Sequence, residues 1–176
     1  MAVSAQSGIF SFGPQVTKGS TPANWYRHRA TLVDLAIIDE TREGPPEVGG
    51  IAVPTFPYKS GPIVAGGVTL QPRYENSFGF LLMAMMGKCV SVADPYNLNV
   101  FNHVFTMDAT STLVPWLGMR KMIPQYQGDP ATDLGEIYKD CKVIGGTLSL
   151  PNDAPLGMRL DVIGREFLLD AAPTGW

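Results

Sequence analysis

The chain has few of the residues on which disulfides, metal sites and membrane spans depend. Its 176 residues include two histidines and two cysteines, and the cysteines, Cys89 and Cys141, lie far apart and outside any CxxC motif. This pattern favours two buried thiols in a reducing compartment over a disulfide or a metal site. The N-terminus lacks the basic and apolar regions of a signal peptide, and no run approaches the roughly 20 apolar residues of a membrane helix. We therefore expect no membrane insertion by this chain, no metal and no cofactor.

Charged residues are also scarce. Lys, Arg, Asp and Glu make up 16% of the chain, against about 25% in soluble domains. The apolar fraction of 45% is ordinary for a globular protein. The low charge therefore predicts a surface that is neutral polar or, as we favour, buried against other subunits. The net charge of −3 and the scattering of the 13 basic residues argue against a surface that grips nucleic-acid phosphates.

Catalytic and nucleotide-binding motifs are missing as well. The patterns GxSxG, GxGxxG and GxxxxGK[ST] do not occur. His103 lies between Phe101 and Phe105 on one face of an expected strand, where a packed structural histidine is the better interpretation than a general base. His28 belongs to a basic cluster that we expect to be solvated or to face an interface. The carboxylates of residues 129–140 lack the spacing of a calcium loop, which favours a solvated acidic loop.

Glycine and proline are abundant instead. Together they make 19 + 15 = 34 of the 176 residues, which favours turns and long loops over helical bundles. Residues 1–29 are rich in Ser, Gly, Pro and Thr, and we interpret them as an extended N-terminal arm that packs onto something else. Residues 40–61 form a long Pro/Gly-rich loop, which is uncommon inside a compact domain and is expected to become ordered against a partner. Residues 171–176 form a C-terminal tail without a pattern.

The intervening residues, 30–170, have the alternation of a β-domain. Strands are expected at 30–39, with both faces largely covered, and at 62–72, 90–92, 100–106, 113–123 and 135–144. One short helix is expected over 76–88, with Asn76 or Ser77 as the N-cap and Gly87 as the C′ residue. This helix is apolar nearly all round, so we expect it to be covered on more than one side; the residues expected to pack are Phe78, Leu81, Leu82 and Met85. The predicted fold is mainly β, an antiparallel sandwich or barrel with one short flanking helix and long loops.

The most informative segment is 141–167, where two alternating runs flank a Pro-Asn-Asp-Ala-Pro turn. A period of two over this length predicts an antiparallel hairpin with one face in a core, formed by Leu148, Leu150, Met158, Leu160 and Val162. The opposite face carries no catalytic grouping and consists of Thr147, Ser149, Arg159 and Asp161. We interpret this polar face as a surface repeated in an assembly.

Taken in order, four stretches within residues 63–166 resemble the tail tube (major tail) proteins of long-tailed bacteriophages: GGVTLQPRYENSFGFLLMAMMGK, FNHVFTMD, VPWLGMRKMI and CKVIGGTLSLPNDAPLGMRLDVIGRE. The resemblance implies a tube domain whose copies form rings, with inner strands that close into a barrel. The rings stack into a tube through which DNA leaves the capsid. It further implies a structural virion protein, not an enzyme, which is assembled in the host bacterial cytoplasm. The implied partners are copies of itself, tape-measure, initiator and terminator proteins, and DNA that passes without specific binding.

The resemblance also suggests roles for particular residues. The polar face of the hairpin would line the lumen, although either hairpin face could do so. The loop 40–61 would contact neighbouring subunits and rings through Arg42, Glu43, Pro45, Pro46, Ile51, Val53, Phe56 and Tyr58. Some family members carry a second domain and would form trimeric rings, whereas this chain is expected to form hexamers.

Three alternatives remain open from the sequence. The first is a tube protein of a secretion or contractile injection system, since related proteins share the fold. The second is a small ligand-binding β-barrel or sandwich with a pocket lined by Trp116, Phe101 and Phe105. The third and weakest is a hydrolase that uses His103 with an Asp.

Overall fold

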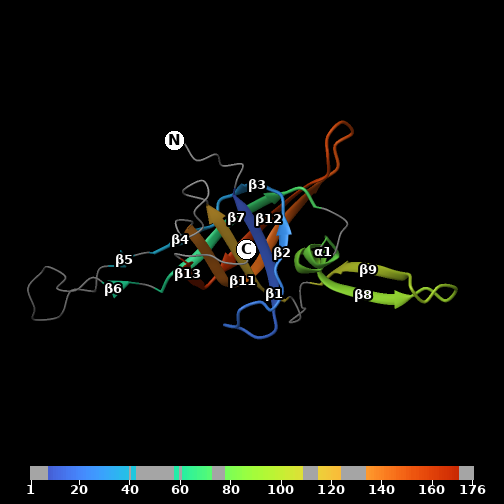
Figure 1. Ribbon diagram of the computed structural model, residues 1–176, viewed down its shortest axis with the longest axis horizontal. Helices are drawn as coiled ribbons and strands as arrows, with labels where there is room; N and C mark the ends of the chain where they lie inside the picture. The colour runs from blue at the N-terminus through green and yellow to red at the C-terminus, as the bar shows by residue number, and fades with distance from the viewer. Residues whose placement is uncertain are drawn as a thin grey trace, which may run out of the picture.

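A computed structural model describes residues 8–39, 41–42, 58–59, 61–72, 78–108, 115–123 and 134–170. Within these ranges the chain is mainly antiparallel β-structure with one short helix, which confirms the predicted fold class (Figure 1). The helix is α1 (Phe78–Met86). The strands are β1 (Ile9–Gln15), β2 (Tyr26–His28), β3 (Ala30–Val33), β4 (Ala36–Ile38), β5 (Thr41–Arg42), β6 (Tyr58–Lys59), β7 (Ile63–Leu70), β8 (Gly87–Ala93), β9 (Phe101–Met107), β10 (Trp116–Ile123), β11 (Leu134–Ser149), β12 (Gly157–Gly164) and β13 (Glu166–Asp170).

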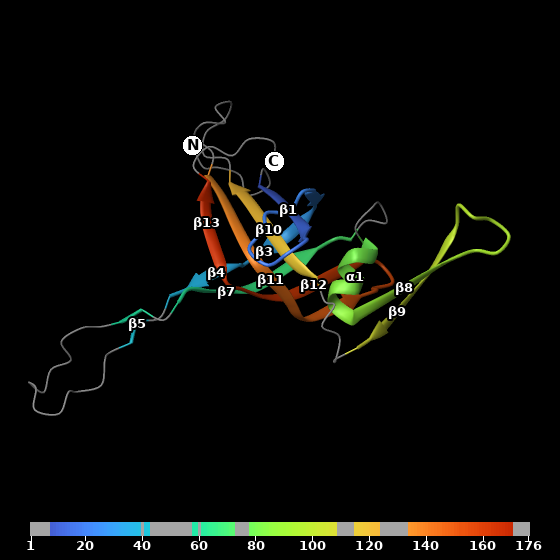
Figure 2. The same cartoon turned by 90° about the horizontal axis from the view of Figure 1, so that it is seen from below.

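Nine of the described strands form one sheet that folds over on itself. Its order is β2-β1-β10-β11-β12-β7-β3, with β13 paired to β11 and β4 paired to β7. The long strand β11 belongs to both halves: residues 134–141 pair with β10 and β13, whereas residues 142–149 pair with β12. Asp140, whose φ is 53°, lies close to this change of partner. The two halves thus form the layers of a sandwich (Figure 2).

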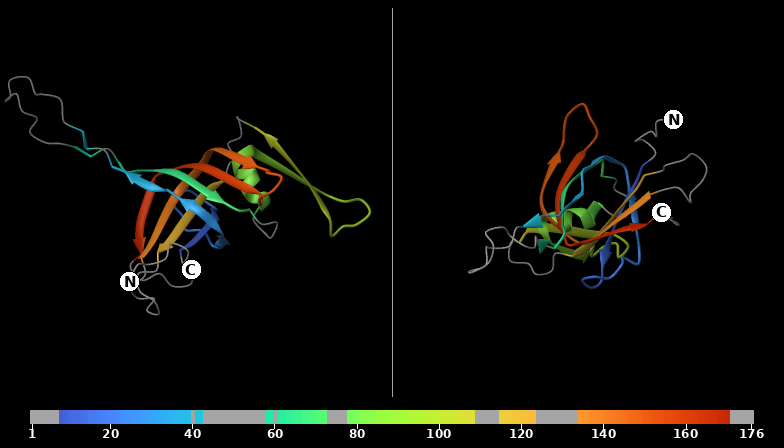
Figure 3. Two further views of the ribbon diagram at one scale, coloured as in Figure 1. Left: turned by 90° about the horizontal axis from the view of Figure 1, so that it is seen from above. Right: turned by 90° about the vertical axis from the view of Figure 1, so that its left-hand side faces the viewer.

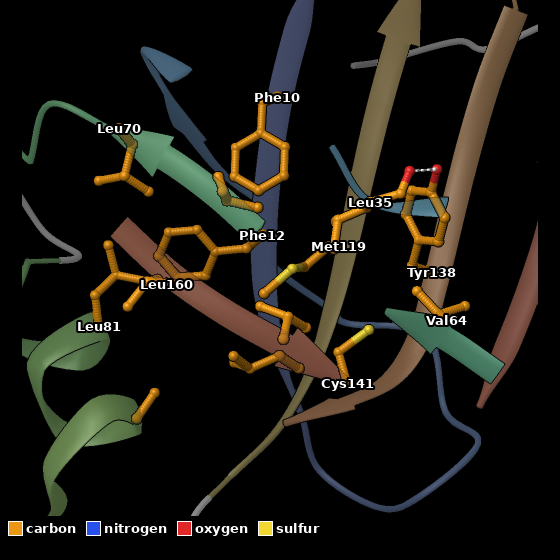
Figure 4. Packing of buried hydrophobic residues seen from close by; sticks show 14 of the residues in the cluster. Phe10, Phe12, Leu35, Val64, Leu70, Leu81, Met119, Tyr138, Cys141 and Leu160 are labelled. Atoms are coloured by element: carbon orange, nitrogen blue, oxygen red, sulfur yellow. Dashed lines mark hydrogen bonds between the residues drawn. The ribbon is translucent and has the colours of Figure 1, made fainter. Parts of the chain in front are cut away.

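The hydrophobic core lies between the two halves (Figure 4). One half contributes Phe12, Met119 and Tyr138, and the other contributes Leu70 and Leu160; each of these residues is at most 1% exposed. Because these side chains come from strands far apart in the sequence, the core depends on non-local pairing rather than on any one hairpin.

The helix α1 packs against this core. Leu81 is fully buried, and the ring of Phe80 stacks on Phe12 with 6.0 Å between centroids and 8° between planes. Other apolar helix residues are partly buried against the core: Phe78, Leu82 and Met85. A Cβ placed on Gly146 of β11 would lie 2.7 Å from the sulfur of Met85, so this glycine allows the helix to approach the sheet closely.

The C-terminal end of the helix lies where the sequence predicts. Gly87 has a φ of 97°, a left-handed conformation that glycine adopts without steric cost. The backbone N–H of Asp108 donates to the carbonyl of Met86 at 2.9 Å, so the helix leads directly into β8 and β9. The candidate N-caps, Asn76 and Ser77, lie outside the described residues.

The strand predicted over 30–39 is interrupted in its middle. Leu35 turns into the core and is 3% exposed, while β3 and β4 both pair with β7 on either side of the break. The Asp34 side chain accepts a hydrogen bond from the backbone N–H of Gly67. A Cβ on Gly66, whose φ is 148°, would lie 2.5 Å from the carbonyl oxygen of Asp34. Strand β7 runs unbroken past this glycine, and the interruption lies in the opposite strand, between β3 and β4.

The expectation that residues 1–29 form an extended arm is wrong for the described part of that segment. Strand β1 lies inside the sheet between β2 and β10, and Phe10 and Phe12 are 4% and 0% exposed. The connection between β1 and β2 covers the outer surface, because a Cβ on Gly118 of β10 would lie 3.1 Å from the ring of Trp25. The domain thus includes residues that the sequence assigns to an arm.

The loop predicted over 40–61 is described only at its two ends. Here β5 and β6 form a two-stranded ladder in which Arg42 pairs with Tyr58. The other residues predicted to make contacts lie outside the described residues: Glu43, Pro45, Pro46, Ile51, Val53 and Phe56. The tail 171–176 also lies outside them.

Candidate functional site

The candidate residues of the hairpin come together on one outer face of the sheet. In β12, Met158, Leu160 and Val162 are 1% exposed, so Arg159 and Asp161 point away from the core. The register places Thr147 of β11 and Thr69 of β7 on either side of Arg159. We call this surface the polar strip; its residues are Asp34, Thr69, Thr147, Ser149, Arg159 and Asp161.

The only arginine of the polar strip is flanked by carboxylates. Its Nε lies 3.2 Å from an oxygen of Asp161, and its Nη2 lies 3.8 Å from an oxygen of Asp34. Arg159 and both aspartates are nearly half exposed, so these pairs contribute little to stability. They do neutralise the arginine, and the strip therefore presents hydroxyl groups and paired charges rather than a free cation to anything that passes over it.

The β11 side of the hairpin differs from the prediction near its turn. Leu148 faces the same side as Met158 but is 36% exposed, and Leu150 is 75% exposed. Strand β7 ends its pairing with β12 at Leu70 opposite Met158, so the hairpin extends past the sandwich. The expectation that both leucines lie in a core is wrong for a single copy of the chain.

A second exposed surface lies at the other end of the same outer face. Ile38, Ile63 and Ile163 are 47%, 45% and 42% exposed. Ile38 pairs with Ile63, and Ile163 pairs with Ala65 of the same strand, so the three isoleucines are neighbours. We call this surface the aliphatic patch. The sequence predicts that both faces of the 30–39 strand are covered, which is wrong for this part of it in a single copy.

The two strands that follow the helix form a third surface, which the sequence does not single out. Strands β8 and β9 make a separate two-stranded sheet that projects from the helix end of the sandwich (Figure 3). We call this hairpin, residues 87–107, the β8–β9 arm. Several of its apolar side chains are about half exposed or more: Val90, Val92, Tyr96, Leu98, Val100, Phe101, Val104 and Met107. The sequence does not reveal this exposure, because side chains alternate with the same period of two in a two-stranded hairpin and in a strand of a sandwich.

His103 lies on this arm, exposed to solvent. Its Nδ1 lies 2.8 Å from the hydroxyl oxygen of Ser91, and its ring lies 6.5 Å from the rings of Phe101 and of Phe105. The hydrolase alternative requires an acid partner and a pocket that orients substrate. The structure instead gives His103 a serine partner within an aromatic row on a projecting hairpin.

The aromatic residues proposed to line a ligand pocket lie on different elements. Phe101 and Phe105 belong to the β8–β9 arm, whereas Trp116 begins β10 in the large sheet. The Trp116 ring is covered by two cations, with Lys142 Nζ 4.4 Å and Lys18 Nζ 5.5 Å from its centroid. These contacts are cation–π interactions that hold the β1–β2 connection against β11.

The buried Tyr138 side chain lies in a hydrogen-bonded network of the described residues. Among all the described residues, no group of three or more His, Cys, Asp or Glu side chains is placed to hold a metal ion. The Tyr138 hydroxyl donates to a carboxylate oxygen of Glu136, which pairs with Lys121, and its oxygen lies 3.1 Å from the backbone carbonyl oxygen of Leu35. Burial, with the bond to Glu136, raises the pKa of Tyr138 well above its usual range. This network joins two layers of the sandwich and is structural.

The two thiols should differ sharply in reactivity. Cys141 is fully buried, and burial, followed by the nearby Asp140, raises its pKa from 9.0 to about 12. Cys89 is partly exposed. In a Cys89→Ser variant at about pH 8, we expect no labelling of the native protein by a thiol reagent and complete labelling in denaturant, because the thiolate is the reactive form. Rapid labelling of the native variant would contradict the burial of Cys141.

The raised pKa also predicts a pH dependence of stability. Above pH 9 the unfolded chain loses the Cys141 proton while the folded chain keeps it up to about pH 12. The folded state then binds more protons, so its stability falls as the pH rises through this interval. Urea unfolding at a series of alkaline pH values should show a steeper loss for the wild type than for Cys141→Ala.

Comparisons with known proteins identify the fold. No protein-family model and no curated protein sequence matches the chain. A solved structure of the SPP1 tail tube matches with a TM-score of 0.50 and 10% identity, over 98% of this chain and 83% of that chain. The AFP tube terminating cap of the anti-feeding prophage matches at 7% identity with a TM-score of 0.49, over 97% and 91% of the two chains. An Hcp protein matches at 9% identity with a TM-score of 0.44, over 96% and 94%.

In the described residues, one large sheet folds into a sandwich with one helix packed at its end. This is the fold of the SPP1 tail tube, as the resemblance in sequence implies. No helix in the described part of the chain is long and apolar enough to cross a membrane.

Proposed function

We propose that the chain is a structural virion protein whose copies assemble into hexameric rings, and that these rings stack into a phage tail tube for DNA ejection. The observation that carries this proposal is the match to the SPP1 tail tube over 98% of the chain. The role is one of assembly rather than catalysis. The chain would act in the tail of the virion, after assembly in the host cytoplasm with initiator, terminator and tape-measure proteins.

The sheet edges support a ring. In the large sheet, β2 ends one side of the strand order and β3 and β4 end the other. Open edges offer unpaired backbone groups to other chains, and closure of several sheets into one barrel removes them. A head-to-tail contact between such edges repeats around a rotation axis and closes when the rotation completes a ring.

The polar strip supports a lumen for DNA. Its arginine is already paired with two carboxylates, and the hydroxyl groups of Thr69, Thr147 and Ser149 carry no net charge. Affinity for DNA depends mainly on free cations that replace counterions on phosphates. A strip of this kind would therefore let DNA slide through the tube without being held.

Electron microscopy of purified protein tests the proposal. Negative-stain images at increasing protein concentration, with and without tail initiator complexes, should show six-fold rings and tubes built from them. Monodisperse monomers under all these conditions would refute the proposal. A thermal-shift screen on the same material addresses the ligand-binding alternative, which predicts a large shift with a small molecule and no rings.

The loop 40–61 is proposed to join one ring to the next. Its described ends form the β5–β6 ladder, which pairs with no strand of the large sheet. Replacement of residues 43–57 by a short Gly-Ser linker should therefore leave the circular dichroism spectrum unchanged and permit rings but not tubes. Tubes of normal length from this variant would contradict the assignment.

Charge reversal in the polar strip should convert a passive surface into one that retains DNA. In Asp161→Lys, Arg159 loses a partner and the strip gains a second cation per copy. We expect tubes of this variant to bind short duplex DNA about tenfold or more tightly than wild-type tubes at low salt, with binding lost as salt rises. Filter binding over a salt series measures this effect. The matched control is Asp153→Lys, which makes the same charge change in the hairpin turn, outside the polar strip. Equal DNA binding by the two variants would contradict the lumen assignment.

A further inference from the structure

The β8–β9 arm is a regular hairpin with many exposed apolar side chains among the described residues. Its seven-residue strands pair from Gly87 opposite Met107 to Ala93 opposite Phe101. The turn is held by Asp94, whose carboxylate accepts hydrogen bonds from the backbone N–H groups of Tyr96 at 2.8 Å and Asn97 at 3.1 Å. A two-stranded hairpin is marginally stable alone in water. An arm with a defined turn and defined register therefore indicates a surface that is covered by something else.

One face of the arm has three valines at its centre, flanked on the same face by Lys88, Asn102 and Thr106. The register places Val90 opposite Val104 and next to Val92, and these three valines are 46%, 56% and 59% exposed. The other face carries the aromatic row, whose Phe105 packs on α1, since a Cβ on Gly79 would lie 3.5 Å from its ring. The aromatic face is thus anchored at its base, whereas no described element packs over the valine face.

The charge of the arm excludes several kinds of partner. Residues 87–107 contain two charged side chains, Lys88 and Asp94, which cancel. Phosphate-rich partners such as nucleic acid, and anionic membranes, are recognised by clustered Lys and Arg. A cluster of valines with a single cation beside it instead matches another apolar protein surface of low charge.

The chain itself carries such a surface. The aliphatic patch consists of three β-branched side chains on neighbouring strands, Ile38, Ile63 and Ile163, each more than two-fifths exposed. The arm projects from the helix end of the sandwich, and β4, which holds part of the patch, lies towards the opposite end (Figures 1 and 2). The arm and the patch of one copy are therefore separated, and the arm points away from the patch.

We propose that the valine face of the β8–β9 arm packs on the aliphatic patch of a second copy of this chain. The contact is heterologous, because arm and patch are different surfaces, so it repeats from copy to copy rather than closing as a dimer. It covers the aliphatic end of the outer face and leaves the polar strip open. This inference rests on the proposed assembly into a tube and assigns one of its subunit contacts.

Matched lysine substitutions test the contact from both sides. Val92→Lys in the arm and Ile163→Lys in the patch should each raise the protein concentration needed for assembly about tenfold or more, because a charge is buried in an apolar contact. The control is Val16→Lys, which makes the same change at a side chain that is 90% exposed in a loop, and it should assemble as the wild type does. Sedimentation and negative-stain imaging measure assembly, and circular dichroism confirms that each variant is folded. If Val92→Lys does not fold, the near-isosteric Val92→Thr replaces it, with a smaller rise expected.

A cross-link then identifies the two surfaces as partners. In a Cys89→Ser background, the pair Val92→Cys and Ile163→Cys should give a ladder of covalent multimers in assembled protein, whereas either cysteine alone gives none. If the wild type forms tubes and both lysine variants assemble normally, the arm contact is overturned and the proposed function stands. The same holds if the wild type forms tubes and the double-cysteine protein gives no ladder. Failure of the wild type to form rings at all would overturn the proposed function and this contact with it.

Discussion

Phe12→Ala is expected to lower the free energy of unfolding by about 3–5 kcal/mol, the range measured for deletion of a large buried aromatic side chain. Phe12 is 0% exposed and packs beside three rings from two other elements, with its ring centroid 4.8 Å from His28 and 6.1 Å from Tyr26 of β2 and 6.0 Å from Phe80 of α1. Its removal opens a cavity between β1, β2 and α1. Since a whole domain is stable by about 5–15 kcal/mol, the variant should be largely unable to assemble.

Urea unfolding followed by circular dichroism measures this loss. The matched control is Phe101→Ala, which removes the same atoms from a side chain that is 53% exposed on the β8–β9 arm. We expect that control to change the unfolding free energy of the monomer by less than about 1 kcal/mol. A Phe12→Ala protein with the midpoint of the wild type would show that residues 9–15 lie outside the cooperative domain, as the sequence alone suggests.

Gly66→Ala is expected to destabilise the fold by about 3 kcal/mol, through backbone strain and a steric clash acting together. The φ of 148° at Gly66 is one that side chains rarely adopt, and a Cβ there would lie 2.5 Å from the carbonyl oxygen of Asp34 and 2.9 Å from the Cα of Leu35. Both contacts are with backbone, which cannot move aside without separating β3 and β4 from β7.

The control for this substitution is Gly61→Ala, two residues before the same strand. A Cβ at Gly61 meets nothing within 4 Å, so we expect a near-neutral effect or a slight gain from the reduced entropy of the unfolded chain. Thermal unfolding of the two variants side by side measures the difference. Equal midpoints would mean that the break between β3 and β4 is not held by close packing against Gly66.

Local patterns account for the elements that the sequence predicts correctly. The β11–β12 hairpin, the strand β7 and the helix α1 each carry their signal within one segment, as period-two alternation or as an apolar run that ends at a glycine. The face to which Arg159 and Asp161 belong follows from the same alternation, because a one-residue shift of register would bury both. These predictions require no knowledge of what each strand packs against.

The N-terminal strand shows why other elements were missed. Its seven residues, IFSFGPQ, contain serine, glycine and proline, and their composition is that of a loop. They form a strand because β10, about a hundred residues later in the chain, offers a partner from Met122 to Trp116. Strand propensity depends strongly on such context, and no window along the sequence contains both partners.

The sequence by itself determined the fold class, the hairpin and the helix, together with the low content of charged residues and the lack of catalytic motifs. Each of these depends on local periodicity or on composition. Only the tertiary structure decided which apolar side chains are buried in the domain and which stay exposed on a single copy. Val68 and Val92 are indistinguishable as residues of alternating strands, yet one is 0% and the other 59% exposed. The difference arises because the sheet that holds Val68 folds over a second layer, whereas the β8–β9 arm projects from the sandwich, and only the path of the whole chain determines this.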